Sequence, residues 1–362
     1  MTDFIEVELD KKVLNHLGYE FKWKEWKRKN SGKFYLKFSL KQYLAILKNG
    51  KEIRTFDIPA TYEYEGRKYK ITSIGKEVFA FCAGLKEINI PDTIKIIKDK
   101  AFRLCLLLKE IVIPDSVIEI KENTFDNCNS LEKIYLPNKL KELSSCVFEN
   151  CRSLKEIIIP DSITKIEDFA FYGCINLKRV KMPNSLKEIG NCAFIECESL
   201  KSLEIPKSVT KIGDCVFNGC FSLKNVTIPD NFKKIPFGFF SDCFSLKSIT
   251  ISNKITEIGE FAFTNCKSLE TIEIPDSVQT IGEKAFLGCE KLKNIKFSNK
   301  LEELKKYTFA NCKSLEIIEI PKNIKKMGIG VFDDCSSLKG INFLSENKFY
   351  ADLTDEILKI LG

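Results

Sequence analysis

The sequence predicts a β-rich solenoid with short turns, because one pattern of side chains returns every 23 residues. Phe occupies twelve positions at this spacing, which are Phe79, Phe102, Phe125, Phe148, Phe171, Phe194, Phe217, Phe240, Phe263, Phe286, Phe309 and Phe332. A Cys follows each Phe by three residues, and a Leu follows each Cys by three, without an insertion. A fixed period of this length indicates coils that stack on one another and share a core.

Each repeat is expected to begin with a short strand. In the unit Leu269–Ile281 (LETIEIPDSVQTI), alternate residues of the strand point to opposite faces. We therefore expect Ile272 and Ile274 to face the core and Thr271 and Glu273 to face solvent. A Pro follows the strand in nine of the twelve repeats and ends it, because Pro cannot donate a ladder hydrogen bond.

The second half of each repeat predicts a bend and a turn. Gly282 and the glycines at equivalent positions are expected to permit a tight bend. The Ala-Phe-x-x-Cys-x-x-Leu segment that follows spaces its apolar residues by three, which suits a single 3₁₀ or α turn. We expect its Cys thiols to be reduced and to fill a small apolar slot beside Phe and Leu.

The pattern LxxIxIPxSVxxIGxxAFxxCxx resembles the BspA-like (Treponema-type) leucine-rich repeat family, and the segment Ile58–Gly75 resembles the hairpin that opens many such arrays. The resemblance covers Ile58–Phe343. It implies a right-handed, horseshoe-like leucine-rich-repeat solenoid, here with twelve repeats. Many members are bacterial or protist surface proteins that bind host or microbial proteins. The resemblance therefore implies a binding role, with adhesion the usual inference.

We expect three parts: an N-terminal cap over residues 1–70, the solenoid over residues 71–344 and a C-terminal cap helix over residues 345–362. The end of a solenoid exposes its core and an unpaired strand edge, and a cap must cover both. In the last part, Ala351–Leu361 carries apolar residues at helical spacing and acidic residues near its start. A partner-binding amphipathic helix is the alternative for this segment.

The N-terminal part is expected to be rich in β-structure. Val7–His16 suits a short helix, while Phe34–Leu47 and Glu52–Ile58 alternate apolar and polar residues loosely, as strands do. Asn49-Gly50 predicts a hairpin turn between these two strands. Thr61–Ile71 predicts a second hairpin.

The net charge of +7 is concentrated near the N-terminus. Residues 1–70 hold 16 Lys or Arg and 10 Asp or Glu, a net of +6, which leaves +1 for the rest of the chain. This distribution argues against nucleic acid as a partner of the whole solenoid. Basic and aromatic residues gather in one cluster, the Trp/Lys cluster, which comprises Lys22, Trp23, Lys24, Trp26, Lys27, Arg28 and Lys29. Such a cluster either forms the surface of the cap or binds anionic partners, such as nucleic acid or membrane headgroups.

The sequence lacks the motifs of common enzymes and metal sites. Its single His, His16, has no nucleophile motif around it, and no phosphate-binding loop, dinucleotide fingerprint or HExxH motif occurs. Zinc sites need converging ligands, commonly in CxxC pairs, which the chain does not contain. We therefore expect no catalytic residue, no metal and no cofactor. Three further cysteines, Cys146, Cys192 and Cys215, lie outside the repeated Cys position.

No apolar run approaches the roughly 18 residues of a membrane-spanning helix. The N-terminal stretch MTDFIEVELDKK is acidic where a signal peptide would be basic. We therefore predict no membrane span. The location stays open between the cytoplasm, unconventional export and, by the family resemblance, the cell surface.

Stacking turns each repeat position into a column on the surface. The residue after the repeat Leu is Lys in nine of the twelve repeats, which predicts a basic stripe that either solubilises the protein or binds a partner. On the strands, Val112, Tyr135 and Ile158 occupy equivalent solvent-facing positions of consecutive repeats and form an apolar ladder. The alternative is that β-branched and aromatic residues are there because they suit strands.

The leading hypothesis is a non-enzymatic protein–protein interaction scaffold, a monomer that binds an unidentified protein on its concave strand face. Its anchors are expected to be Val112, Tyr135 and Ile158, with Glu110, Lys133 and Glu156 as polar neighbours. The alternative is a binder of anionic surfaces that uses the Trp/Lys cluster.

Overall fold

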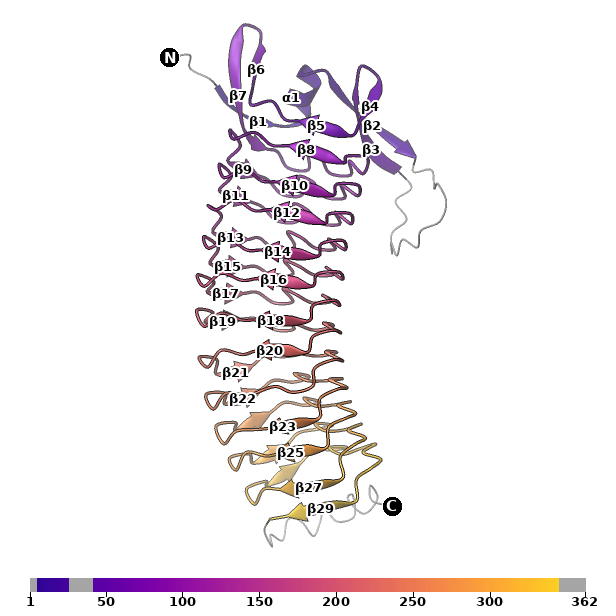
Figure 1. The fold of residues 1–362 in the computed structure, drawn as a ribbon, viewed down its shortest axis with the longest axis vertical. Helices are drawn as coiled ribbons and strands as arrows, with labels where there is room; N and C mark the ends of the chain where they lie inside the picture. Colours follow the sequence, from indigo (N-terminus) through magenta and orange to yellow (C-terminus); the bar gives the residue numbers. More distant parts are fainter. Residues whose placement is uncertain (1–4, 26–41, 345–362) are drawn as a thin grey trace.

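The computed structural model describes residues 5–25 and 42–344, which form one elongated stack of coils (Figure 1). The coils follow one another in sequence order from the indigo N-terminal end to the yellow C-terminal end. The predicted repeat solenoid is confirmed, and the stack is a long, gently bent column. The division of the chain at residues 70 and 344 stays a prediction.

One side of the column, the strand face, carries β5 (Thr55–Asp57) and the short strand that opens eleven of the twelve repeats; residues 248–250 of the remaining repeat do not form a strand. The repeat strands are β8 (Glu87–Asn89), β10 (Glu110–Val112), β12 (Lys133–Tyr135), β14 (Glu156–Ile158), β16 (Arg179–Lys181), β18 (Ser202–Glu204), β20 (Asn225–Thr227), β23 (Thr271–Glu273), β25 (Asn294–Lys296), β27 (Ile317–Ile320) and β29 (Gly340–Phe343). Paired repeat strands are parallel and shifted by one period, as in Ile272↔Ile295. Ile272 and Ile274 are buried while Thr271 and Glu273 are exposed, as predicted.

A second side carries the second ladder, in which β1 (Ile5–Leu9) and β7 (Arg67–Ile74) are followed by strands of two residues each. These are β9 (Ile96–Ile97), β11 (Glu119–Ile120), β13 (Glu142–Leu143), β15 (Lys165–Ile166), β17 (Glu188–Ile189), β19 (Lys211–Ile212), β21 (Lys234–Ile235), β22 (Glu257–Ile258), β24 (Thr280–Ile281), β26 (Glu303–Leu304) and β28 (Lys326–Met327). The second residue of most of these pairs is buried, so this ladder closes the core on a second side.

The third side, the turn side, consists of tight turns around the repeated Phe and Cys. The Cys105 amide donates to the Phe102 carbonyl at 3.1 Å, which closes a β-turn and not the expected 3₁₀ or α turn, because Leu104 inside it has a positive φ. Alternate amides donate instead to the next coil, such as Phe102 N–H to Thr124 O at 2.9 Å. The residues two before and two after each repeat Phe have a positive φ, for example Lys100 (56°) and Leu104 (61°). The sequence did not predict these left-handed positions.

The interior is a continuous stack of phenyl rings. Neighbouring repeat Phe rings lie 5.1 to 6.0 Å apart between centroids and are close to parallel. The rings are buried from Phe79 to Phe332. Ring stacking of this kind adds roughly 0.5–1.5 kcal/mol per pair to the free energy gained by burial.

The repeat cysteines lie beside this stack and do more than fill space. From Cys105 to Cys335, each Sγ donates a hydrogen bond of 3.2–3.3 Å to the carbonyl of the Phe that lies 26 residues earlier. The thiols therefore point along the column toward the preceding coil. Burial raises the pKa of these thiols well above the ordinary value, as at Cys151 and Cys243, so they stay protonated.

Strands near the N-terminus extend both ladders. β5 pairs in parallel with β8, which places Phe56 at the end of the phenyl stack, 5.3 Å from Phe79. β1 pairs in parallel with β7, and β7 pairs with β9. β6 (Thr61–Tyr64) and β7 form the predicted hairpin. A further sheet of β2 (Tyr19–Glu25), β3 (Gln42–Lys48) and β4 (Lys51–Ile53) contains the predicted turn at Asn49-Gly50, where both φ angles are positive.

Several expectations for this region were wrong. Val7–His16 is not one helix, because Val7–Leu9 belongs to β1 and only Lys11–His16 forms α1, capped by the Asp10 carboxylate, which accepts from the Val13 amide at 2.8 Å. Glu52–Ile58 is not one strand, because β4 and β5 join different sheets. Phe34 to residue 41 and the predicted helix Ala351–Leu361 lie outside the described residues.

The bend glycines have a role that the sequence did not predict. Gly282 and Gly259 do not have a positive φ. They are required instead where coils approach closely: a Cβ on Gly259 would lie 2.7 Å from the carbonyl carbon of Pro236 in the preceding coil.

Phe194→Ala should destabilise the protein by about 3–5 kcal/mol, because the ring is fully buried and stacks on Phe171 and Phe217. Ser202→Ala, on the exposed position of a neighbouring strand, should cost less than about 0.5 kcal/mol. Denaturant unfolding of both variants measures the difference. Equal midpoints would contradict the stacked core.

An alkylating reagent should label Cys146, Cys192 and Cys215 in the folded protein and leave the repeat thiols unlabelled, because only these three are partly exposed among the described cysteines. Alkylation requires the thiolate, and burial raises the pKa of Cys146 to about 12 and that of Cys192 to about 11. Labelling of these two should therefore accelerate about tenfold per pH unit below their pKa. Mass spectrometry counts the labels, and labelled repeat thiols without denaturant would contradict their burial.

Candidate protein-interaction site

The apolar ladder predicted from the sequence forms on the strand face. β10 and β12 are parallel with Val112 beside Tyr135, and β14 brings Ile158 to the next coil. The side chains of Val112, Tyr135 and Ile158 are 58%, 51% and 68% exposed. They point outward because the central residue of each strand, such as Ile134, points into the core.

The backbone holds this ladder in place. The Ile113 amide donates to Tyr135 O at 3.0 Å, and the Ile159 amide donates to Lys181 O at 3.0 Å. Paired strands lie about 4.8 Å apart, as β10 and β12 do, whereas β12 and β14 belong to separate two-stranded sheets. Three apolar side chains of this size on a rigid backbone can anchor a partner with little loss of conformational entropy.

The polar neighbours predicted for this site flank it. Glu110 lies beside Lys133 in the parallel register, and all three predicted neighbours are exposed. Glu156 forms an ion pair of 2.9 Å with Arg179 on the following coil. The anchors are therefore bordered by side chains of both signs, as in the polar rim of a protein interface.

One exposed apolar residue of the strand face was missed. Ile317 on β27 is 58% exposed. It occupies the same column as Glu110, nine periods along the chain. A search of this column, as well as that of Val112, would have found Ile317. The residues before and after Ile317 in the column are Asn294 and Gly340, so Ile317 has no apolar neighbour there.

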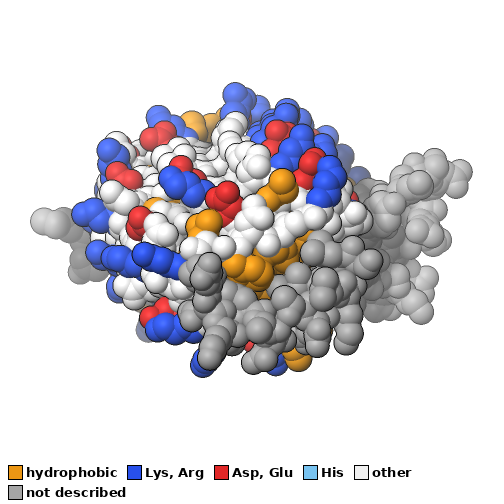
Figure 2. All heavy atoms as spheres, turned by 90° about the horizontal axis from the view of Figure 1, so that it is seen from below, with side chains coloured by type: hydrophobic (Ala, Val, Ile, Leu, Met, Phe, Trp, Pro, Cys, Tyr) orange, Lys and Arg blue, Asp and Glu red, His pale blue; other side chains and the backbone are white. Residues whose placement is uncertain are grey.

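The column of lysines is partly neutralised. Glu residues that interrupt it pair with the lysine of the next coil: Lys155 with Glu132 at 2.7 Å and Lys339 with Glu316 at 3.0 Å. The hydrogen bond from Lys155 lowers the pKa of Glu132. Figure 2 shows basic and acidic side chains interspersed around the C-terminal end of the column. This mixture does not favour an anionic partner for the solenoid.

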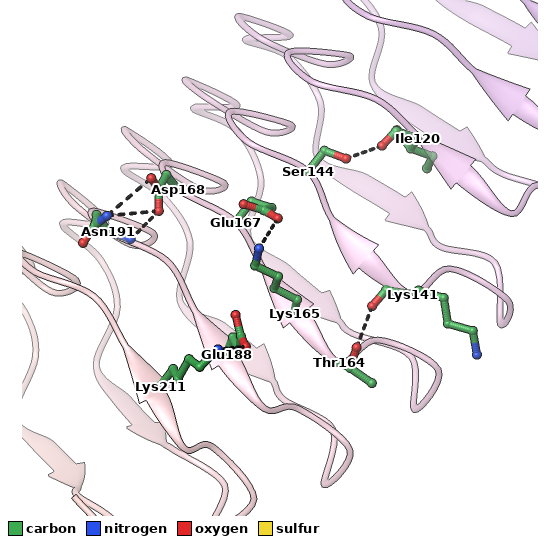
Figure 3. A network of polar contacts seen from close by, with 10 residues as sticks. All are labelled: Ile120, Lys141, Ser144, Thr164, Lys165, Glu167, Asp168, Glu188, Asn191 and Lys211. Carbon is green, nitrogen blue, oxygen red and sulfur yellow. Dashed lines mark hydrogen bonds and ion pairs between the residues drawn. The ribbon is translucent and has the colours of Figure 1, made fainter. Parts of the chain in front are cut away.

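Polar side chains on the second ladder also bind one another (Figure 3). The backbone amide of Asn191 donates to the Asp168 carboxylate at 2.7 Å, and the side-chain amide of Asn191 donates to it at 3.3 Å. Lys211 pairs with Glu188 at 2.7 Å, also across one coil boundary. The Ser144 hydroxyl donates to Ile120 O at 2.5 Å. A partner that docked on this side would have to compete with these contacts.

The Trp/Lys cluster is described only in part. Lys22, Trp23 and Lys24 lie on β2, and Lys22 forms an ion pair of 3.1 Å with Glu20. The side chains of Trp23 and Lys24, and residues 26–29 entirely, fall outside the described part of the structure. Binding of anions at this cluster stays a prediction.

The described residues contain no group of three or more His, Cys, Asp or Glu side chains that could hold a metal ion. His16 stacks on Tyr64 with the ring centroids 4.3 Å apart. Within residues 5–25 and 42–344, no helix is long and apolar enough to cross a membrane.

The model of the BspA type leucine rich repeat region (6 copies) matches residues 67–178, 164–275 and 256–352. No curated protein is significantly similar to the chain. Among solved structures, a leucine-rich repeat protein from Bacteroides ovatus is similar, with 28% identity, coverage of 89% of this chain and 92% of the other, and a TM-score of 0.68.

A leucine rich cell surface protein from Faecalibacterium prausnitzii is similar at 25% identity, with coverage of 85% of this chain and 92% of the other, and a TM-score of 0.60. The pneumococcal vaccine antigen PcpA, at 20% identity and a TM-score of 0.54 over 83% of this chain and 76% of the other, shares the fold. The matched repeats span most of the sequence, and the protein belongs to the BspA-type leucine-rich repeat family.

Proposed function

We propose that the protein is a non-enzymatic scaffold that binds a protein partner on its strand face, with Val112, Tyr135 and Ile158 as the anchors. The observation that carries this proposal is their consecutive position on three coils with more than half of each side chain exposed. Contiguous exposed apolar groups mark interaction sites more often than single exposed residues do.

The energetics favour a protein over a small molecule. Burying one such side chain contributes roughly 1.5–3 kcal/mol, so three anchors supply several kcal/mol toward the cost of association. The anchors lie on a strand surface flanked by exposed charged residues, which suits a partner that brings its own apolar side chains and a complementary polar rim. The aromatic Tyr135 in the middle is typical of an interface hot spot.

The family and its relatives support a binding role at a cell surface. The similar protein from Faecalibacterium prausnitzii is described as a cell surface protein. Adhesion or interaction with a host is the form of binding that this relationship suggests for the present chain, and it belongs to the same proposal.

The variant Val112→Ser/Tyr135→Ser/Ile158→Ser should lose the partner. Each anchor should contribute about 2 kcal/mol, equivalent to about 30-fold in Kd. Stability should change little, because the replaced side chains are exposed. Pull-downs from bacterial and host lysates with wild type and variant, quantified by mass spectrometry, identify proteins whose capture depends on these residues.

The matched control is Glu204→Ser/Thr227→Ser/Glu273→Ser, at exposed positions of the same column on later coils. It should capture the same proteins as wild type. If the anchor variant retained every partner at full yield, the proposed site would be wrong.

The salt dependence of partner binding distinguishes this proposal from binding of anionic surfaces. Contacts of apolar anchors should survive a rise from about 0.05 M to about 0.2 M salt, whereas binding through several Lys and Arg would weaken by orders of magnitude. Partner capture measured across this range gives the answer. If moderate salt abolished partner capture, and the anchor variant captured the partner as well as wild type does, the Trp/Lys cluster would be the binding site instead.

A further inference from the structure

The three cysteines outside the core share one column of the turn side. Cys146, Cys192 and Cys215 each lie two residues before a repeat Phe, and each has a φ of 54–55°. All three are partly exposed. Cys192 and Cys215 occupy consecutive coils, whereas the neighbours of Cys146 in the column are Asn123 and Phe169.

Hydrogen bonds hold the coils of Cys192 and Cys215 together next to the sulfur atoms. The Cys192 amide donates to Asp214 O at 2.8 Å. The side chain of Asn191 accepts from the Asp214 amide at 2.9 Å. These contacts flank both cysteines and hold their backbones on adjacent coils. The usual spacing of paired backbones, about 4.8 Å, lies within the 4.4–6.8 Å between Cα atoms that a disulfide requires.

The two thiols occupy adjacent coils of the column and influence each other's ionisation. Burial and, after it, the neighbouring Cys215 raise the pKa of Cys192. The Cys215 sulfur lies against Gly238 on the following coil, where a Cβ would be only 2.8 Å from it. The repeat thiols differ from these two in their surroundings, because all of them are buried and nearly all donate to Phe carbonyls, as Cys220 does to Phe194.

We propose that Cys192 and Cys215 form a reversible disulfide between two coils in the middle of the solenoid, by exchange with a low-molecular-weight disulfide such as oxidised glutathione. The thiolate of one Cys attacks the small disulfide, forms a mixed disulfide and releases one small thiol. The second Cys then attacks the protein sulfur of the mixed disulfide and releases the second small thiol. The two cysteines lose two electrons and two protons, and one small disulfide becomes two thiols. The bond would tie the two coils together covalently and hinder their local separation.

The test treats the folded full-length protein with oxidised glutathione at about pH 9. Alkaline pH is needed because burial, the neighbouring Cys215 and the carboxylates of Asp168 and Asp214 raise the pKa of Cys192 to about 11. Remaining thiols are then alkylated, and peptides are mapped without reduction. We expect a peptide pair joined through Cys192 and Cys215, loss of alkylation at both, and recovery of both after a reductant is added.

Cys146→Ser is the matched control, because it removes a thiol from the same column that has no thiol on an adjacent coil. This variant should form the link to the same extent as wild type. In Cys192→Ser, Cys215 should retain glutathione as a mixed disulfide, because the second attack is impossible. In wild type, Cys146 should likewise accept glutathione or stay free.

Three results would overturn the proposal. Glutathione could remain on both Cys192 and Cys215 in wild type, both could stay open to alkylation, or the link could form only in denaturant. Each would show that the coils do not bring the two sulfur atoms to bonding distance in the folded protein.

Discussion

The one-period register between coils is the constraint on which the rest of the structure depends. Residue i lies beside residue i+23 on both ladders, as in Glu188↔Lys211 and Thr271↔Asn294. On the turn side, amides bind the next coil as well. A single inserted residue in a strand would turn its inward side chains outward. The absence of insertions from Phe79 to Leu338 follows from this constraint.

The same register stacks equivalent side chains about 4.8 Å apart, which favours some residue types and penalises others. Phenyl rings gain by stacking, and thiols gain a carbonyl partner in the preceding coil. Like charges in one column would repel. Opposite charges face each other at some positions, as with Glu132 and Lys155, although the same column also places lysines on five consecutive coils from Lys155 to Lys247. Each such exposed pair contributes little to stability, so its main effect is to remove the repulsion.

Sequence periodicity was sufficient to predict the core, since the Phe, Cys and Leu of each repeat follow directly from the spacing. It could not predict conformations imposed by other coils. Lys100 and Phe169 have positive φ although nothing in their side chains favours it, because hydrogen bonds to the next coil hold them there. Val7–Leu9 forms a strand because it pairs with β7. The local sequence could not show this, since β7 lies more than sixty residues further along the chain. The sequence could have predicted that Cys192 and Cys215 lie on adjacent coils, because they are separated by one period of 23 residues.

The faces of the column differ in what a partner would have to displace. On the second ladder, carboxylates and ammonium groups already bind one another, as in Glu188 and Lys211. Docking there would exchange existing contacts for new ones, with desolvation as an added cost. The side chains of Val112 and Ile158 make no hydrogen bonds, so covering them releases water from apolar surface without breaking a polar contact. Tyr135 between them adds a hydroxyl that can bind across an interface. A partner would therefore gain most free energy at the part of the strand face where the repeat pattern leaves apolar side chains in solvent.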